Sequence, residues 1–316
     1  MFRLETILVG VDLSRRDRLV GKKLNRHASI AYQSAVKLAR LSGAHLHFLY
    51  ALEVSVDAQK RIQTDRRLSP TILDMAEDRM KGLVQDACKE GVTATGGVVF
   101  GRSWLALIRE VLRGHYDLVM VGTRRLGTMK SMLMGSIGVQ LLRKCPCPVF
   151  VCKEPIRDEL ASVLLANDQT TAGRTAMELA SGLAELHHSD LHVLHSLAGY
   201  TGTPGQPEQM SVDEVVSTKE QLALQLSESG LTSRARVQLA PKSSFCTAIS
   251  DHIYRHGNRL LVLGTSGCDG FSRMIKRDRS ERLLAKVPCS LIAVKPIDFV
   301  CPIRLEALEN PARGAA

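Results

Sequence analysis

The sequence predicts an α/β protein made of two tandem, doubly wound domains, each with a five-stranded parallel sheet. Apolar runs of strand length alternate with amphipathic helical segments along the chain, a pattern typical of parallel sheets covered by helices on both faces. The chain also repeats itself: residues 117–123 (DLVMVGT) return as 259–265 (RLLVLGT), and 145–147 (CPC) return as 287–289 (VPC) at the same offset. A period this long gives each copy the length of a domain and indicates a tandem duplication.

Hydrophobic spacing and glycine stops define the elements of the first copy. Residues 7–11 form a near-continuous apolar run, which predicts a strand covered on both faces. Apolar residues at helical spacing predict a helix over 28–41, and Gly43 just beyond it is a typical stop signal. Residues 57–70 form a polar stretch to which no element is assigned. The remaining strands are expected at 46–51, 97–100, 118–121 and 149–152, and the remaining helices at 71–90, 104–113 and 136–144.

The second copy repeats this order of elements. Between two of them, residues 199–209 contain three glycines and two prolines and predict a flexible excursion. Strands are expected at 163–166, 191–195, 236–239, 260–263 and 291–294, and helices at 174–186, 212–229, 245–255 and 279–286. A charged segment separates the copies, so we expect domains at 1–154 and 155–298, followed by a tail (299–316) with one short helix at 304–308.

Composition restricts the class of protein. The chain has 316 residues, of which 45% are hydrophobic and only 4% are aromatic, so two aliphatic cores are expected and base-stacking surfaces are not. No apolar run approaches the roughly 20 residues that span a bilayer. The start of the chain does not resemble a signal peptide, which favours a cytoplasmic location, no membrane partner, and reduced thiols for the eight cysteines.

The net charge of +10 raises the question of nucleic-acid binding. The densest basic segment, residues 15–26, has no counterpart in the second copy and lies between the first strand and the first helix. Charge alone gives attraction to phosphates without sequence selectivity, and the chain contains no recognisable nucleic-acid module. We therefore interpret the segment as a solvated loop and expect no sequence-specific nucleic-acid partner.

The carboxyl ends of the strands in the first copy carry the candidate binding residues. In open α/β sheets, ligands bind at this edge, near the switch in strand order. Asp12 and Ser14 follow the first strand, and Gly122 and Thr123 end the fourth. Glycines allow a close approach of backbone amides to phosphate oxygens, and a helix that begins at Ser136 adds a favourable dipole.

In this order of features the chain resembles the universal stress protein family, and its doubling resembles the tandem, E-type members. The resemblance implies Rossmann-like domains of the adenine nucleotide alpha hydrolase type, forming an intramolecular pseudo-dimer. Nucleotide-binding members carry Gly-x2-Gly-x9-Gly-Ser/Thr after the fourth strand and an Asp after the first. The resemblance thereby implies that ATP or another adenine nucleotide contacts Asp12, Gly122, Thr123, Gly135 and Ser136 in the first copy, and Asp168, Gly264 and Gly267 in the second.

Neither copy matches the family motif completely. The first has Arg125 where the second glycine belongs, and this side chain either clamps a phosphate or fills the space that the backbone approach needs. The second copy has Arg277-Asp278 in place of Gly-Ser, and a carboxylate there would repel a phosphate. We expect the nucleotide in the first domain.

Histidines and cysteines give weaker signals. His47 and His192 occupy matching strand positions, but neither these nor His195 belong to a set with metal-ligand spacing, so no metal site is expected. The cysteines near residue 150 lack a Cys-x2-Cys pair and are interpreted as buried small hydrophobic residues. No catalytic triad or carboxylate pair can be assigned, so we assign no catalytic residue.

The resemblance also predicts pairing of the two last strands, 149–152 and 291–294, around a pseudo-two-fold axis, and leaves a homodimer open. We expect a cytoplasmic stress-response protein that binds an adenine nucleotide without metabolic catalysis. The alternatives are a scaffold that binds no nucleotide, a second domain that binds a larger apolar ligand, and weak ATP hydrolysis.

Overall fold

The computed structural model describes residues 3–15, 18–64, 71–123, 136–156, 162–167, 170–197, 212–228, 235–241, 245–265 and 287–305. The chain divides into two compact units. The first domain comprises Leu4–Pro155 with Asp298–Ala316, and the second comprises Ile156–Ile297 with Met1–Arg3. Each unit has its own parallel sheet, which confirms the predicted α/β class with two tandem doubly wound domains.

The sheet of the first domain has the strand order β3-β2-β1-β4-β5, and its strands pair in parallel. The chain builds outward from β1 to β3 and then returns to place β4 on the other side of β1. This reversal is the switch point where open α/β sheets bind ligands. The strands are β1 (Thr6–Gly10), β2 (His45–Leu52), β3 (Ala94–Phe100), β4 (Leu118–Gly122) and β5 (Val149–Cys152).

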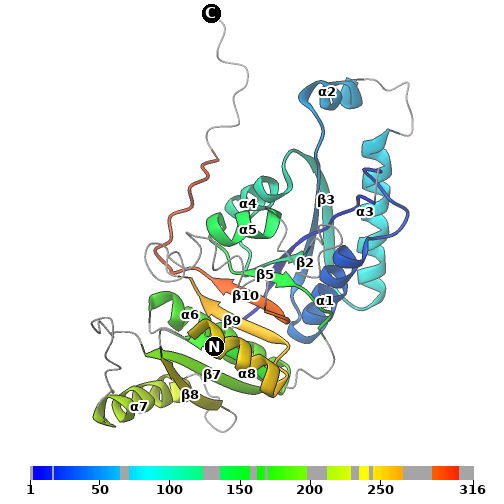
Figure 1. Ribbon diagram of the computed structural model, residues 1–316. Helices are drawn as coiled ribbons and strands as arrows, with labels where there is room; N and C mark the ends of the chain where they lie inside the picture. Colours follow the sequence, from blue (N-terminus) through cyan, green and yellow to red (C-terminus); the bar gives the residue numbers. More distant parts are fainter. Residues whose placement is uncertain are drawn as a thin grey trace, which may run out of the picture. The chain divides into compact units, whose positions relative to one another are not determined.

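Helices cover both faces of this sheet. Helices α1 and α3 lie on one side of it, and α4 and α5 lie on the other (Figure 1). The three central residues of β1, 7–9, are fully buried between these layers. Phe48 is also fully buried and stacks on Tyr32 of α1, with 5.3 Å between ring centroids. The helices are α1 (Arg26–Ser42), α2 (Val56–Thr64), α3 (Ile72–Lys89), α4 (Ser103–Arg113) and α5 (Ser136–Lys144).

Two details of the first domain differ from the sequence-based expectation. Helix α2 occupies part of the polar stretch 57–70, to which no element was assigned. It buries no residue, and its apolar side chains, Val56, Ala58 and Ile62, are too few to stand out from the polar stretch. Strand β3 begins earlier than expected, because residues 94–97 contain two glycines and a threonine rather than an apolar run.

The second domain repeats the arrangement, with strand order β10-β9-β6-β7-β8 and parallel pairing. The expected excursion at 199–209 and the helix at 279–286 lie outside the described residues, as does most of the helix expected at 304–308. The described elements are β6 (Ser162–Asn167), α6 (Thr171–Leu186), β7 (Asp190–Leu197), α7 (Val212–Glu228), β8 (Ala235–Pro241), α8 (Phe245–His256), β9 (Leu260–Gly264) and β10 (Ser290–Val294). Within the described part of the chain, no helix is both long and apolar enough to cross a membrane.

Candidate functional site

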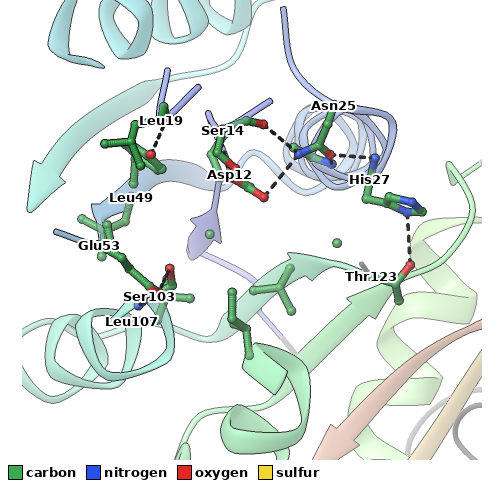
Figure 2. Close-up of a pocket in the computed structure, with 18 residues that line it drawn as sticks. Asp12, Ser14, Leu19, Asn25, His27, Leu49, Glu53, Ser103, Leu107 and Thr123 are labelled. Carbon is green, nitrogen blue, oxygen red and sulfur yellow. Dashed lines mark hydrogen bonds between the residues drawn. The ribbon is translucent and has the colours of Figure 1, made fainter. Parts of the chain in front are cut away.

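A cleft of about 200 Å³ lies in the first domain at the carboxyl ends of β1, β2 and β4. Figure 2 shows the side chains that line it. Its walls also include the first residues of three helices, namely His27 and Ala28 of α1, Ser103 of α4 and Ile137 of α5. A helix N-terminus carries the positive end of the helix dipole, so the convergence of three such ends favours an anionic group in the cleft.

Asp12 shapes the edge of the cleft beside β1. Its Oδ1 accepts hydrogen bonds from the backbone amide of Ser14 at 2.9 Å and from the Ser14 hydroxyl at 2.6 Å. Its Oδ2 accepts a hydrogen bond from Asn25 Nδ2 at 3.3 Å. The Asp-x-Ser pattern thus folds locally into an Asx turn, which directs the chain away from the strand and holds one carboxylate in the cleft.

Asn25 connects this turn to the start of α1 (Figure 2). Its Oδ1 accepts hydrogen bonds from the amides of His27 and Ala28, at 3.1 and 2.9 Å, as an N-cap residue does. The His27 ring then reaches the end of β4, where its Nδ1 lies 3.4 Å from Oγ1 of the buried residue Thr123. A continuous polar chain therefore runs from Asp12 to Thr123 along one wall of the cleft.

Asn25→Ala is expected to lower the free energy of unfolding of the first domain by about 1 kcal/mol, because two amides of α1 lose their cap. Urea denaturation measures this change. Asn25→Ser retains a capping oxygen, so its effect should be well under half as large. Equal losses for the two variants would contradict the capping role.

Glu53 occupies the opposite wall of the cleft, at the end of β2. Its Oε1 accepts hydrogen bonds from the backbone amide and the hydroxyl of Ser103, both at 2.7 Å. Helix α4 has no side-chain cap of its own, since Arg102 at its N-cap position makes no such bond. Glu53 therefore caps α4 from the end of a neighbouring strand and places a negative charge at that helix end.

A basic strap, residues 15–26, borders the cleft between β1 and α1. Its backbone is anchored by three sets of hydrogen bonds: a two-way bridge between Arg15 and Arg18, Gly21 N to Leu13 O at 2.8 Å, and the Tyr50 hydroxyl to Leu19 O at 2.6 Å. Its cationic side chains are exposed, and within the described residues none of them forms an ion pair. The described ones are Arg15, Arg18, Lys22, Lys23 and Arg26.

Gly122 ends β4 against the first turn of α1. A Cβ atom at this position would lie 2.8 Å from the carbonyl carbon of His27 and closer still to its oxygen. Gly264 ends β9 in the same way, because a Cβ there would lie 2.6 Å from backbone atoms of Ala172 and Gly173 at the start of α6. Both glycines are thus required for close packing of a helix on a strand, which is a role distinct from phosphate contact.

The structure brings together three of the residues singled out from the sequence: Asp12, Gly122 and Thr123 line one cleft. Ser136 is the first residue of α5, and Gly264 ends β9. The other candidates, Arg125, Gly135, Asp168 and Gly267, lie outside the described residues.

Sequence reasoning missed four polar residues of the cleft. Asn25 stands directly before an amphipathic helix, so the N-cap signal could have identified it. His27, Glu53 and Ser103 carry no local signal, because their partners are distant along the chain. Only the packing of α1 and α4 against the strand ends brings these side chains to the site.

The cysteine and histidine candidates from the sequence have surroundings that favour a structural role. Burial raises the pKa of the Cys147 and Cys152 thiols, which therefore stay protonated and act as small apolar side chains. His47 Nδ1 lies 2.9 Å from Thr95 Oγ1, and burial lowers the pKa of His47. Among the residues that the structure describes, no group of three or more His, Cys, Asp or Glu side chains could hold a metal ion.

Comparison with known proteins agrees with the fold and the repeat. The model of the universal stress protein family matches residues 4–153 and again residues 160–295. The chain therefore belongs to the universal stress protein family and carries two copies of its domain in tandem.

Among the relatives, the similarity extends to proteins named universal stress protein E. The protein of that name from Photorhabdus laumondii subsp. laumondii is 25% identical over 228 residues, which cover 64% of this chain and 69% of the relative. The one from Escherichia coli K12 is 23% identical over 221 residues, covering 66% and 70% respectively. A solved universal stress protein from Archaeoglobus fulgidus superposes with a TM-score of 0.71 at 16% identity, covering 93% of this chain and 100% of that one, and shows the shared fold.

Proposed function

We propose that this protein is a stress-response protein that binds an adenine nucleotide in the cleft of the first domain and does not catalyse a metabolic reaction. The observation that carries the proposal is the position of the cleft. It lies at the switch point of the sheet, where β1 and β4 end, and it is lined by Asp12, Gly122 and Thr123. Along the sequence, a segment with glycines (124–135), which lies outside the described residues, separates Thr123 from the N-terminus of α5.

The chemistry of the walls supports binding rather than bond cleavage. Each of the two carboxylates in the cleft accepts hydrogen bonds from a neighbouring backbone amide and a serine hydroxyl: Asp12 from Ser14, and Glu53 from Ser103. These contacts hold the carboxylates as parts of the cleft wall. The apolar residues Leu49, Ala51 and Leu107 line the same cleft and offer a surface for a flat base.

Isothermal titration of the whole protein with ATP, ADP and AMP tests the proposal. We expect one nucleotide to bind per chain, at concentrations below millimolar. The absence of binding heat for all three ligands up to millimolar concentration would contradict nucleotide binding and favour the scaffold alternative. Uridine triphosphate serves as a control ligand, because it carries the same phosphates without the adenine base.

The basic strap is expected to strengthen this binding through long-range attraction. Arg15→Glu/Arg18→Glu should weaken ATP binding on the order of tenfold at low ionic strength, and much less at 0.5 M salt, where the charges are screened. Arg40→Glu/Arg113→Glu is the matched control, because it makes the same charge change at the C-terminal ends of α1 and α4, whose N-termini line the cleft. Equal weakening by both pairs would show a general charge effect and would contradict a specific role for the strap.

We further infer that β5 and β10 pair with each other within the chain. Each is a short apolar strand at one end of the strand order of its own domain, so each offers an edge for pairing. A protease site introduced at residues 157–161 tests this inference by size-exclusion chromatography after cleavage. The two halves should stay together, and two soluble halves that separate would contradict it.

A further inference from the structure

A cluster of histidines lies in the second domain, apart from the proposed nucleotide site. His192 of β7 and His252 of α8 are only 6% and 7% exposed, and His192 Nδ1 lies 2.8 Å from His252 Nε2. The exposed ring of His256, one turn further along α8, lies 4.3 Å from the His252 ring between centroids. The hydrogen bond between the two buried rings joins α8 directly to the sheet, and we call it the histidine latch.

The partners of the latch fix where its protons lie. His252 Nδ1 is 3.2 Å from Gln238 Oε1 of β8, and an amide oxygen only accepts hydrogen bonds. His252 Nδ1 therefore carries the proton, and in the neutral ring Nε2 is left as an acceptor. When both rings are neutral, His192 Nδ1 donates to His252 Nε2. With one extra proton the bond is kept, because His192 can carry its own proton on Nε2 and accept at Nδ1, from which Asn258 Nδ2 also lies 3.4 Å. The chain of hydrogen bonds from β7 through α8 to β8 is lost only when both imidazoles are cationic.

A second proton on both rings breaks this chain. Two N–H groups then face each other across 2.8 Å, and both rings are buried. The charged groups nearby do not favour the cation: Arg255 and His256 lie on α8, and Arg236 lies on β8. Asp190 of β7 is the one acidic group among the charges acting on His192, and Arg236 binds its carboxylate at 3.4 Å.

The first domain gives an internal comparison at the matching position. There His47 of β2 lies 2.9 Å from Thr95 Oγ1, and a hydroxyl can either donate or accept a hydrogen bond. Protonation of His47 therefore leaves it with a partner. The residue in α4 that matches His252 is Glu110, which accepts a hydrogen bond from the Tyr116 hydroxyl at 2.9 Å. The two domains thus differ in how they tolerate a proton at this position.

We propose that the histidine latch makes the attachment of α8 to the sheet of the second domain sensitive to pH: the latch is closed while at least one of His192 and His252 is neutral, and it opens when both rings are cationic. The first domain has no histidine latch at the matching position, so acid should weaken the attachment of α8 in the second domain and leave α4 in the first domain unaffected.

The direction of the pH dependence follows from the folded-state titration. Burial, followed by the nearby His256, lowers the pKa of His252 from its usual 6.5 to about 4, and burial likewise lowers the pKa of His192. Because the folded domain takes up these protons at lower pH than the unfolded chain, the stabilisation is complete above the unfolded pKa of about 6.5 and is lost progressively as the pH falls toward about 4.

Hydrogen exchange of the full chain tests the latch. Mass spectrometry measures it at pH 7.5 and pH 5.0, and the rates are corrected for the intrinsic exchange rate at each pH. Protection of the α8 peptide is expected to fall about tenfold at the lower pH, while protection of α4 stays the same. Unchanged protection of α8, or an equal loss in α4, would overturn the proposal.

Two variants distinguish opening of the latch from a general effect of acid on the protein. His252→Gln removes the titrating group but keeps an amide able to accept from His192, so the pH dependence of α8 should disappear. His47→Gln is the matched control and should leave the response of α8 intact. If His252→Gln fails to fold, nitrogen NMR of the unmodified protein decides: protons on Nδ1 of both His192 and His252 at pH 7.5 support the latch, and the opposite tautomer of either ring overturns it.

Discussion

Gly122→Val is expected to lower the free energy of unfolding of the first domain by at least about 3 kcal/mol and to abolish nucleotide binding. The added side chain would overlap backbone atoms of His27 in the first turn of α1. Backbone cannot move aside as the end of a flexible side chain can, so α1 must shift away from β4. That shift separates His27 from Thr123 and distorts the cleft wall between them. Chemical denaturation measures the stability, and titration with ATP measures the binding.

Two glycines serve as references for this prediction. Gly97 lies in the same sheet, and a Cβ added there would meet no atom closer than 3.8 Å, so Gly97→Ala should be tolerated. Gly264→Ala should destabilise the second domain, because its Cβ would lie 2.6 Å from backbone atoms at the start of α6, yet it should leave ATP binding unchanged. Full stability and full binding in Gly122→Val would show that the contact between β4 and α1 does not shape the cleft.

Asp12→Ala is expected to weaken ATP binding by roughly ten- to a hundredfold. The substitution removes the acceptor for the Ser14 amide, the Ser14 hydroxyl and Asn25 Nδ2. Hydrogen bonds to an ionised group contribute about 1.5–3 kcal/mol each, and loss of the equivalent of one such bond accounts for an effect of this size. The edge of the cleft then loses its fixed conformation, and the ligand must order it on binding. Titration calorimetry gives the change in Kd.

Asp86→Ala is the matched control for Asp12→Ala. It removes the same charge from the same domain, but Asp86 is an exposed residue of α3 whose partner is Lys89. Its effect on ATP binding should be less than twofold, since exposed ion pairs contribute little. Circular dichroism confirms that both variants stay folded. If the two variants bind ATP equally well, Asp12 has no part in the site.

Much of the fold could be predicted from the sequence because its signals are local. The apolar run at 7–11 and the glycine stop at Gly43 each depend on only a few neighbouring residues, and the duplication presents most of these signals twice. Helix α2 could not be predicted, because it has no buried face and only three of its nine residues, Val56, Ala58 and Ile62, are apolar. The amphipathic pattern that identifies other helices reports packing against a core, which α2 lacks.

The candidate site was only partly predictable. Asp12 and Gly122 stand at strand ends, and strand ends are visible in the sequence. Gly122 was singled out for phosphate approach, which stays a prediction, and the structure adds its close packing against His27. Glu53 and Ser103 meet through the fold alone, because one ends β2 and the other begins α4. No spacing rule relates two residues that far apart.

The histidine latch also escaped sequence reasoning. His192 was noted only as the counterpart of His47, and without a metal-ligand pattern it was interpreted as a core or surface histidine. Its partner His252 lies on a helix that crosses the sheet later in the chain. Two copies of one fold can therefore diverge in chemistry at matching positions while their strand patterns stay alike.

Amide NMR of the uniformly labelled protein, titrated with ATP, tests the central claim most directly. The account predicts that the amides of Asp12, Ala51, Gly122 and Thr123 shift together with one dissociation constant, because these residues line one cleft. The amides of β6 to β10 should stay unchanged. Shifts confined to the second domain, or no shifts at millimolar ATP, would contradict a nucleotide site at the strand ends of the first domain.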